Sequence, residues 1–371
     1  MLDERIKPIV MPKWGLSMSE GKVTGWLKRP GSKVAVGEEL LEVETEKIAG
    51  VVEAGDAGTL RRVLGEPDTV YPIKALLGVL ADDDVPDADI DAFVAGYVAP
   101  AADDEESEEA GPSYEFVETP AGRLRYAKRG EGGETVVLIH GFGGDLDNWL
   151  FNIDALTGAG TVYALDLPGH GQSGKALKDA SLKGLSAALL GFMDALGIAK
   201  AHLVGHSMGG AVALRTAIDH PDRVASLALI SSAGLGPDIN AGYIDGFVSS
   251  TSRRDLKPVL EQLFEDPGLV SRQLVDDVLK YKRIDGVDTA LSALAAKLFP
   301  GGRQTDQLAG EAGSLPPVLI IFGAGDRVIP AAHAGALGPA AKVEVIEGAG
   351  HMVQMEKASR VNELLLGQIR R

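Results

Sequence analysis

An acidic segment that cannot bury apolar surface divides this chain of 371 residues into two parts. It runs from Ala99 to Pro112 and combines Ala and Pro with a block of Asp and Glu. Because it lacks apolar periodicity and its carboxylates repel one another, burial cannot offset the entropy that would be lost on ordering it. We therefore expect a flexible linker between two folded parts. The chain length, which exceeds the size at which a single core usually stops growing, agrees with this division.

The composition excludes several classes of function. A net charge of -17 and a pI of about 4.9 disfavour nonspecific binding to nucleic acid or to an anionic membrane face. No apolar run is long enough to span a bilayer, and no signal peptide is evident. Cysteine is absent, which rules out disulfides, thiolate metal sites and a cysteine nucleophile. We expect a cytoplasmic protein that has no metal site.

Short β segments separated by Gly, Pro and Asp fill the part before the linker. The candidate strands are residues 6–10, 21–27, 39–43, 50–53 and 58–63. The run 40–43 (Leu-Leu-Glu-Val) resembles the run 76–79 (Leu-Leu-Gly-Val), and two similar halves fit a pseudo-symmetric β sandwich. Residues 87–98 have apolar spacing suited to a short helix. We predict a β domain over residues 5–82, followed by this helix and the linker over 83–113.

Lys47 stands between two of the expected strands, in the run Val43-Glu44-Thr45-Glu46-Lys47-Ile48-Ala49. A tight turn of this kind provides a fixed frame from which a lysine amine can reach a modifying enzyme. This run and the opening Met11–Gly21 resemble the lipoyl domain of 2-oxo acid dehydrogenase acyltransferase subunits. The resemblance implies a flattened sandwich of the lipoyl/biotinyl type, with lipoate attached to Lys47 by a lipoate ligase. Biotin carriers share the fold but usually flank the lysine with Met, so Glu46 and Ile48 favour lipoate.

One turn of the β domain departs from the lipoyl pattern. Gly37 falls where the family uses a turn glycine, and its counterpart in the second half would be Ile73 or Lys74. Neither is glycine, so we expect that turn to differ.

After the linker, strand-like and helix-like segments alternate, which indicates an α/β fold with a largely parallel sheet. The expected strands are residues 135–139, 162–165, 201–204, 227–230 and 317–322, and helices are expected at 182–196 and 210–218. An insertion from about residue 236 to 308 breaks the alternation. It has helical patterns at 258–264 and 274–281, and we interpret it as a lid. We predict one α/β domain over residues 114–371.

Ser207 has the sequence context of a nucleophile. The run Gly205-His206-Ser207-Met208-Gly209 follows an apolar strand and precedes a helix of small residues, which is the setting of a nucleophile elbow. The helix N-terminus adds partial positive charge where an oxyanion would develop. The loop His140–Gly144 resembles the HG-x-G segment of α/β-hydrolases. We therefore expect the backbone N–H groups of Met208 and Phe142 to form an oxyanion hole.

Asp326 and His351 complete the expected catalytic set. The chain order Ser207, Asp326, His351 is that of α/β-hydrolases. His351 would take the proton from Ser207 and return it to the leaving group, and Asp326 would fix its tautomer. The run 166–174 also resembles the family and is interpreted as a structural turn. The remaining histidines are expected to be structural or exposed: His140, His170, His202, His206, His220 and His333.

A lipoyl domain joined by a linker to an α/β-hydrolase domain resembles the acyltransferase (E2) subunit of bacterial acetoin dehydrogenase complexes. The resemblance implies that acetyl moves from lipoyl-Lys47 to coenzyme A through Ser207, His351 and Asp326. It also implies partners, namely a thiamine diphosphate-dependent dehydrogenase (E1) and a dihydrolipoamide dehydrogenase (E3), and it leaves a homo-oligomer open. Basic residues of the lid would attract the phosphates of coenzyme A: Arg253, Arg254, Lys257, Lys280, Lys282 and Arg283.

Two alternatives remain open from the residues alone. Transfer and hydrolysis use the same acyl-enzyme, so the second domain could instead cleave an ester, a thioester or a C–C bond with water. A non-enzymatic carrier and scaffold with a degenerate hydrolase domain is the third class. The intact set of Ser207, Asp326 and His351 argues against it.

Overall fold

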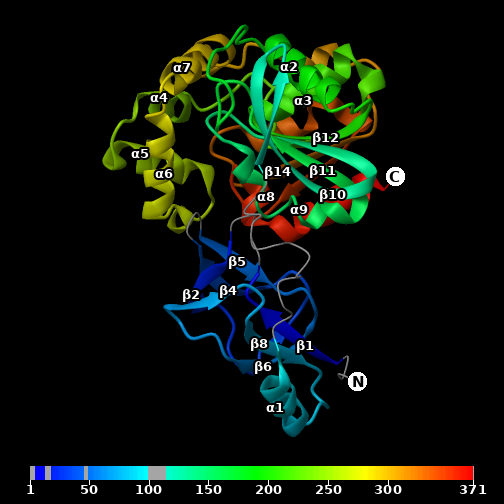
Figure 1. Ribbon diagram of the computed structural model, residues 1–371, viewed down its shortest axis with the longest axis vertical. Coiled ribbons are helices and arrows are strands. Elements are labelled where there is room, and N and C mark those ends of the chain that lie inside the picture. The colour runs from blue at the N-terminus through cyan, green and yellow to red at the C-terminus, as the bar shows by residue number, and fades with distance from the viewer. Residues whose placement is uncertain (1–4, 13–17, 46–48, 99–113, 371) are drawn as a thin grey trace. The chain divides into compact units, whose positions relative to one another are not determined.

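The computed structural model describes residues 5–12, 18–45, 49–98 and 114–370. The chain forms two compact units, residues 1–112 and 113–371 (Figure 1). The first is all-β apart from one helix, and the second is an α/β unit with a mixed, mostly parallel sheet. The expected fold class, a lipoyl-type sandwich plus an α/β-hydrolase fold, is confirmed.

Two four-stranded antiparallel sheets form the first unit, with strand orders β1-β8-β6-β3 and β5-β4-β2-β7. Their inward-facing residues, such as Met11, Leu41, Leu60 and Leu77, are fully buried and form one core. The strands are β1 Ile6–Val10, β2 Glu20–Trp26, β3 Lys33–Val34, β4 Glu39–Glu44, β5 Ala49–Glu53, β6 Gly58–Val63, β7 Thr69–Pro72 and β8 Leu76–Ala81.

The two halves of this unit are related by a pseudo-two-fold pattern of backbone hydrogen bonds. Gly37 N donates to Ala54 O at 2.8 Å in the first half, and Lys74 N donates to Met11 O at 2.8 Å in the second. Gly37 has φ +83° and Lys74 has φ +64°, so both turns use the left-handed region. The expectation that the second turn would differ is wrong. Backbone hydrogen bonds with Met11 fix the turn at Lys74. The lysine therefore adopts a left-handed conformation that glycine would adopt more easily.

The same pattern corrects the register of the internal repeat. Leu27 N donates to Leu40 O at 2.8 Å, and Leu64 N donates to Leu77 O at 2.7 Å. Leu40 therefore corresponds to Leu77, not to Leu76 as the sequence match suggested. Adjacent leucines in both runs made a one-residue shift invisible in the sequence.

Helix α1 (Asp87–Gly96) packs on the outer face of the sheet that contains β8. Ile90 is fully buried against a cluster that includes Val79. Two arginines of β6 bind its acidic first turns: Arg61 lies 3.0 Å from Asp87 and Arg62 lies 2.7 Å from Asp91. The helix is thus part of the first unit.

A seven-stranded sheet forms the centre of the second unit, in the order β11-β10-β12-β13-β14-β15, with β9 paired antiparallel to β10. All other pairings in this sheet are parallel. The strands are β9 Tyr114–Thr119, β10 Gly122–Ile139, β11 Gly160–Leu165, β12 Ala201–His206, β13 Val224–Ile230, β14 Val318–Gly323 and β15 Ala341–Ile346. The helices of this unit outside the insertion are α2 Leu182–Ala195, α3 Met208–Asp219, α8 Val353–Glu356 and α9 Ala358–Ile369.

The insertion between β13 and β14 carries a group of helices set beside the sheet (Figure 1). They are α4 Ala241–Ser249, α5 Arg253–Leu260, α6 Arg272–Lys282 and α7 Val287–Leu298. Helices α5 and α6 overlap the two helical patterns expected from the sequence, whereas α4 and α7 were missed. The alanine and leucine content of α7 would have indicated it, since both residues are strong helix formers.

Candidate active site

Ser207 occupies a sharp turn between β12 and α3. Its φ of +52° and ψ of −119° lie outside the usual regions for a non-glycine residue, and its side chain is buried. Its backbone N–H donates to Ile230 O at 2.9 Å, which ties the turn to the end of β13. A strained, over-determined backbone of this kind is what a nucleophile elbow requires.

Gly209 lets α3 start directly against the end of β10. A Cβ atom at this position would lie 2.3 Å from Ile139 O and 2.4 Å from His140 O. Met208 is the first residue of α3, so its N–H has no intrahelical partner and is available to an oxyanion. The close approach places the start of the helix beside the loop that holds Phe142.

Aromatic rings from the insertion pack around the Phe142 loop. Phe142 is buried, and its ring meets Phe247 edge-on at 5.9 Å and Phe299 at 6.1 Å between ring centroids. Gly143 has φ +73°, and a Cβ there would lie 2.4 Å from the Phe247 ring. Lys282 donates to Phe247 O, with its ammonium 5.2 Å from the centroid of that ring. Residues of α4 and α6, and Phe299 just after α7, therefore shape this loop.

His351 and Asp326 form a buried hydrogen-bonded pair. His351 Nδ1 lies 2.8 Å from Asp326 Oδ2, and their side chains are 2% and 0% exposed. Because a carboxylate oxygen accepts, Nδ1 carries the proton and Nε2 is left as the base. The other oxygen, Oδ1, accepts from Val328 N at 2.8 Å and from Ile329 N at 2.9 Å. Burial raises the pKa of Asp326, but the charge and hydrogen bonds of its partners outweigh this, and its pKa lies below the ordinary value.

His206 links the elbow to the loop that carries His351. Its Nε2 donates to His351 O at 2.9 Å, and the two rings lie 4.7 Å apart between centroids. Burial and then the nearby His351 charge lower the pKa of His206 to about 3, so the ring stays neutral. The sequence around His206 predicts a structural residue and carries no local signal that it contacts a residue so distant in the chain.

Glu356 connects the His351 loop to the insertion. The sequence did not predict a role for this residue. Its carboxylate accepts from Gly350 N at 2.7 Å and from Glu265 N at 2.7 Å. Met352 N also donates to Leu263 O at 3.0 Å. The position of His351 therefore depends on the insertion as well as on the central sheet.

His140 and His170 have structural roles, as the sequence analysis expected. His140 Nδ1 donates to Gly141 O at 2.7 Å, while its Nε2 accepts from Leu167 N at 3.0 Å. Burial lowers the pKa of His140 to about 4 and that of His170 to about 3. Asp166, in the expected structural turn, is fully buried and pairs with Arg125 at 2.7 Å. These groups hold the base of the loop that carries Phe142.

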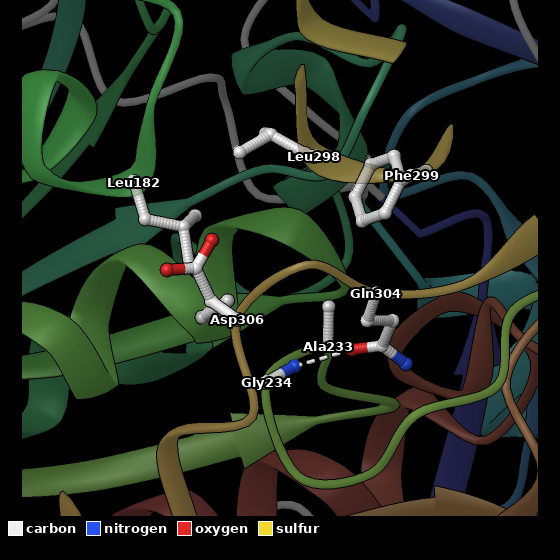
Figure 2. Close-up of a pocket in the computed structure, with 8 residues that line it drawn as sticks. Leu182, Ala233, Gly234, Leu298, Phe299, Gln304 and Asp306 are labelled. Atoms are coloured by element: carbon white, nitrogen blue, oxygen red, sulfur yellow. Dashed lines mark hydrogen bonds between the residues drawn. The ribbon is translucent and has the colours of Figure 1, made fainter. Parts of the chain in front are cut away.

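A small, partly open pocket lies beside the elbow (Figure 2). Ala233 in its wall donates its N–H to Ser207 O at 3.0 Å, and Phe299 in its wall packs against Phe142. A hydrogen bond of 2.6 Å from Gly234 N to Gln304 Oε1 fixes one side, and the Asp306 side chain lies opposite (Figure 2). The lining residues are Leu182, Ala211, Ala233, Gly234, Leu298, Phe299, Gln304 and Asp306.

Several basic residues expected to attract coenzyme A have partners within the insertion. Arg253 pairs with Asp276, and Lys280 lies 2.8 Å from Asp277. Lys257 lies 3.6 Å from Glu261, and Lys282 donates to backbone carbonyls. Three of the six basic residues are thus paired with carboxylates, which reduces the positive charge on which the expectation relied.

Lys47 lies outside the described residues, but the strands that flank it are described. β4 and β5 pair antiparallel up to the pair Glu44 and Ala49. Among the residues that the structure describes, no group of three or more His, Asp or Glu could hold a metal ion, and no helix is long and apolar enough to cross a membrane.

Comparison with known proteins decides the family. Residues 134–358 match the alpha/beta hydrolase fold model and residues 7–77 match the biotin-requiring enzyme (biotin/lipoyl) model. The chain is 56% identical to the dihydrolipoyllysine-residue acetyltransferase component of the acetoin cleaving system of Cupriavidus necator, over 97% of this chain and 96% of that protein. It belongs to this acetyltransferase family.

A second family member, from Pseudomonas putida, is 49% identical over 99% of both chains. The α/β unit of the acetyltransferase is also similar to hydrolases of other substrates. A 2-hydroxy-6-oxononadienedioate/2-hydroxy-6-oxononatrienedioate hydrolase of Paraburkholderia phymatum is 32% identical over 66% of this chain and 90% of that protein. The meta-cleavage product hydrolase CumD of Pseudomonas fluorescens superposes with a TM-score of 0.64 at 29% identity, over 69% of this chain and 97% of its own.

Proposed function

We propose that this acetyltransferase moves an acetyl group from lipoyl-Lys47 to coenzyme A through an acetyl ester on Ser207. The observation that carries the proposal is the buried Asp326–His351 pair, which His206 ties directly to the elbow of Ser207. Lipoate on Lys47 would supply the thiol that bears the acetyl group. The lipoyl-type fold and the hairpin on either side of Lys47 support this attachment.

The first half-reaction is attack on the donor thioester. Ser207 Oγ attacks the carbonyl carbon while His351 Nε2 takes the hydroxyl proton. The N–H groups of Met208 and Phe142 stabilise the oxyanion. The C–S bond then breaks, and His351 returns its proton to the departing thiolate. Asp326 holds the ring and stabilises its charged form throughout.

The second half-reaction passes the acetyl group to coenzyme A. His351 accepts the thiol proton, the sulfur attacks the ester of Ser207, and the C–O bond breaks as the proton returns to Oγ. An E1 dehydrogenase would load the arm and an E3 dihydrolipoamide dehydrogenase would reoxidise it.

The test is to trap the acetyl-enzyme. Acetyl-dihydrolipoamide is added without coenzyme A, and intact mass spectrometry follows the protein. An acetyl increment in the wild type that Ser207→Ala lacks is expected, with Ser231→Ala as the matched control. Ser231 is buried, also has a positive φ and lies at the end of the adjacent strand. In a second assay coenzyme A is supplied as well. Formation of acetyl-CoA by Ser207→Ala at the wild-type rate would overturn the covalent role.

Similarity to these hydrolases makes hydrolysis the second candidate. Free acetate released at an equal rate with and without coenzyme A would favour it. The carrier role is tested separately, by the intact mass of protein expressed in cells supplied with lipoate. The wild type should carry a lipoyl increment, and Lys47→Arg should lack it.

A further inference from the structure

Strand β15 forms an open edge of the sheet in the second unit. It pairs with β14 along its whole length without a register shift, and no other described strand pairs with its far side. Val343 and Val345 on this strand are 39% and 47% exposed. Unpaired edges of this kind are usually blunted by a bulge, a proline, a short strand or charged side chains. No bulge or proline interrupts residues 341–346, and the charges on this strand are those of Lys342 and Glu344.

The direction of the free hydrogen-bonding groups follows from one contact. Ile346 O accepts from Ala324 N at 2.9 Å, so the backbone groups of Ile346 point toward β14. Because these directions alternate along a strand, the N–H and C=O groups of Ala341, Val343 and Val345 point away from the sheet.

The charges on β15 select one way of pairing it with a second copy of itself. With Val343 opposite Val343 of the second copy, Lys342 of each chain stands opposite Glu344 of the other. Shifting the pairing by two residues either way places Lys342 opposite Lys342 or Glu344 opposite Glu344. In the register that places opposite charges together, Val343 pairs with Val343 of the second copy and Ala341 pairs with Val345. The backbone groups of these residues point away from the sheet, so these are the hydrogen-bonded pairs.

We propose that two copies of this chain associate through antiparallel pairing of their β15 strands, centred on Val343. The resulting interface is two-fold symmetric and extends the sheet across both molecules. In the single chain, Lys342 lies 3.0 Å from Glu344, which also lies 3.6 Å from Arg360. In the pair, each Lys342 and Glu344 exchanges its own partner for the equivalent group of the second copy. A dimer of this kind brings two acetyltransferase sites and two carrier domains into one particle.

Sedimentation velocity of the full chain over a wide concentration range tests the proposal. The wild type should show a reversible monomer–dimer equilibrium. Val343→Lys places two ammonium groups opposite each other and should abolish the dimer. Lys342→Glu sets like charges opposite each other twice and should raise the dissociation constant by about tenfold. Lys257→Glu, which makes the same charge change on α5, should have no effect.

Two further combinations separate specific pairing from general destabilisation. The double variant Lys342→Glu/Glu344→Lys restores complementary charges and should recover the dimer. Lys342→Glu mixed with Glu344→Lys should form heterodimers about as tightly as the wild type pairs, although each variant alone associates about tenfold more weakly. A wild type that stays monomeric throughout, as expected if β15 instead receives an extended segment of another protein, would overturn the proposal. A dimer unaffected by Val343→Lys and Lys342→Glu would do the same.

Discussion

His206 Nε2 donates a hydrogen bond of 2.9 Å to the backbone oxygen of His351, so the residue before Ser207 holds the loop that carries His351. Within the described part of the chain, the other ring nitrogen, Nδ1, is buried without a hydrogen-bond partner. Because one buried ring nitrogen makes no hydrogen bond, the polar contribution of this side chain comes from the bond between Nε2 and His351 O. His206 is therefore a positioning residue, and its substitution affects His351 before it affects the fold.

We predict that His206→Leu lowers kcat by about a hundredfold, because a displacement of about 1 Å of a reacting group costs this much. His206→Gln offers an amide N–H at a similar distance and should recover much of the activity. Steady-state kinetics and thermal unfolding of both variants distinguish the roles. Equal losses in Leu and Gln, in proportion to lost stability, would mean that His206 only fills space.

The Asp326–His351 pair gives a second prediction. Asp326→Asn removes the carboxylate that fixes the His351 tautomer, and kcat should fall by about 10⁴-fold. Single-turnover acetyl transfer measures this fall. A loss of less than about tenfold would show that another group orients His351.

The same variant tests the pH dependence of stability. Because the pKa of Asp326 lies below its ordinary value, the carboxylate stabilises the fold above pH about 4 and loses this effect as the pH falls through its native pKa. The wild type should exceed Asp326→Asn in free energy of unfolding near neutral pH, and the gap should close in acid. Urea titrations across this range would contradict the prediction if the gap widened on acidification.

Gly143→Ala should damage catalysis more than stability. A Cβ at this position would lie 2.4 Å from the Phe247 ring, and φ +73° strains any other residue. Moving the loop displaces the Phe142 N–H, and the loss of one oxyanion donor costs about a hundredfold in kcat. Gly301→Ala is the matched control, since Gly301 has φ +61° and no atom within 4 Å of an added Cβ. A comparable loss of activity in the control would point to backbone strain alone.

Glu356→Ala should destabilise the α/β unit by about 1–3 kcal/mol, because the N–H groups of Gly350 and Glu265 would lose their acceptor. Glu356→Gln keeps one acceptor oxygen and should cost less. Chemical denaturation reports the free energy, and kcat reports whether the His351 loop has loosened. An unchanged kcat in the alanine variant would separate the lid contact from catalysis.

The sequence predicted those parts of the site that depend on short-range patterns. The elbow around Ser207 needs a strand, a turn and a helix in consecutive residues, and the chain order of Asp326 and His351 follows from the sheet. The contacts of His206 with His351 and of Glu356 with Glu265 join residues far apart in sequence, so no local pattern reveals them. Lys74 shows the same limit, because backbone hydrogen bonds from across the sandwich, and not its side chain, set its left-handed turn.

Helix α1 has a consequence for how the acetyl group is delivered. Tyr97, just after the helix, donates its hydroxyl to Lys74 O at 3.0 Å, so the chain leaves the carrier domain beyond this point. By sequence, at most the residues between Tyr97 and Tyr114 join the two units, and they would measure about 50 Å at full extension. For a flexible connection of that length, effective concentrations are generally in the millimolar range. Free acetylated carriers would have to reach that concentration before they compete with the domain that the protein carries itself.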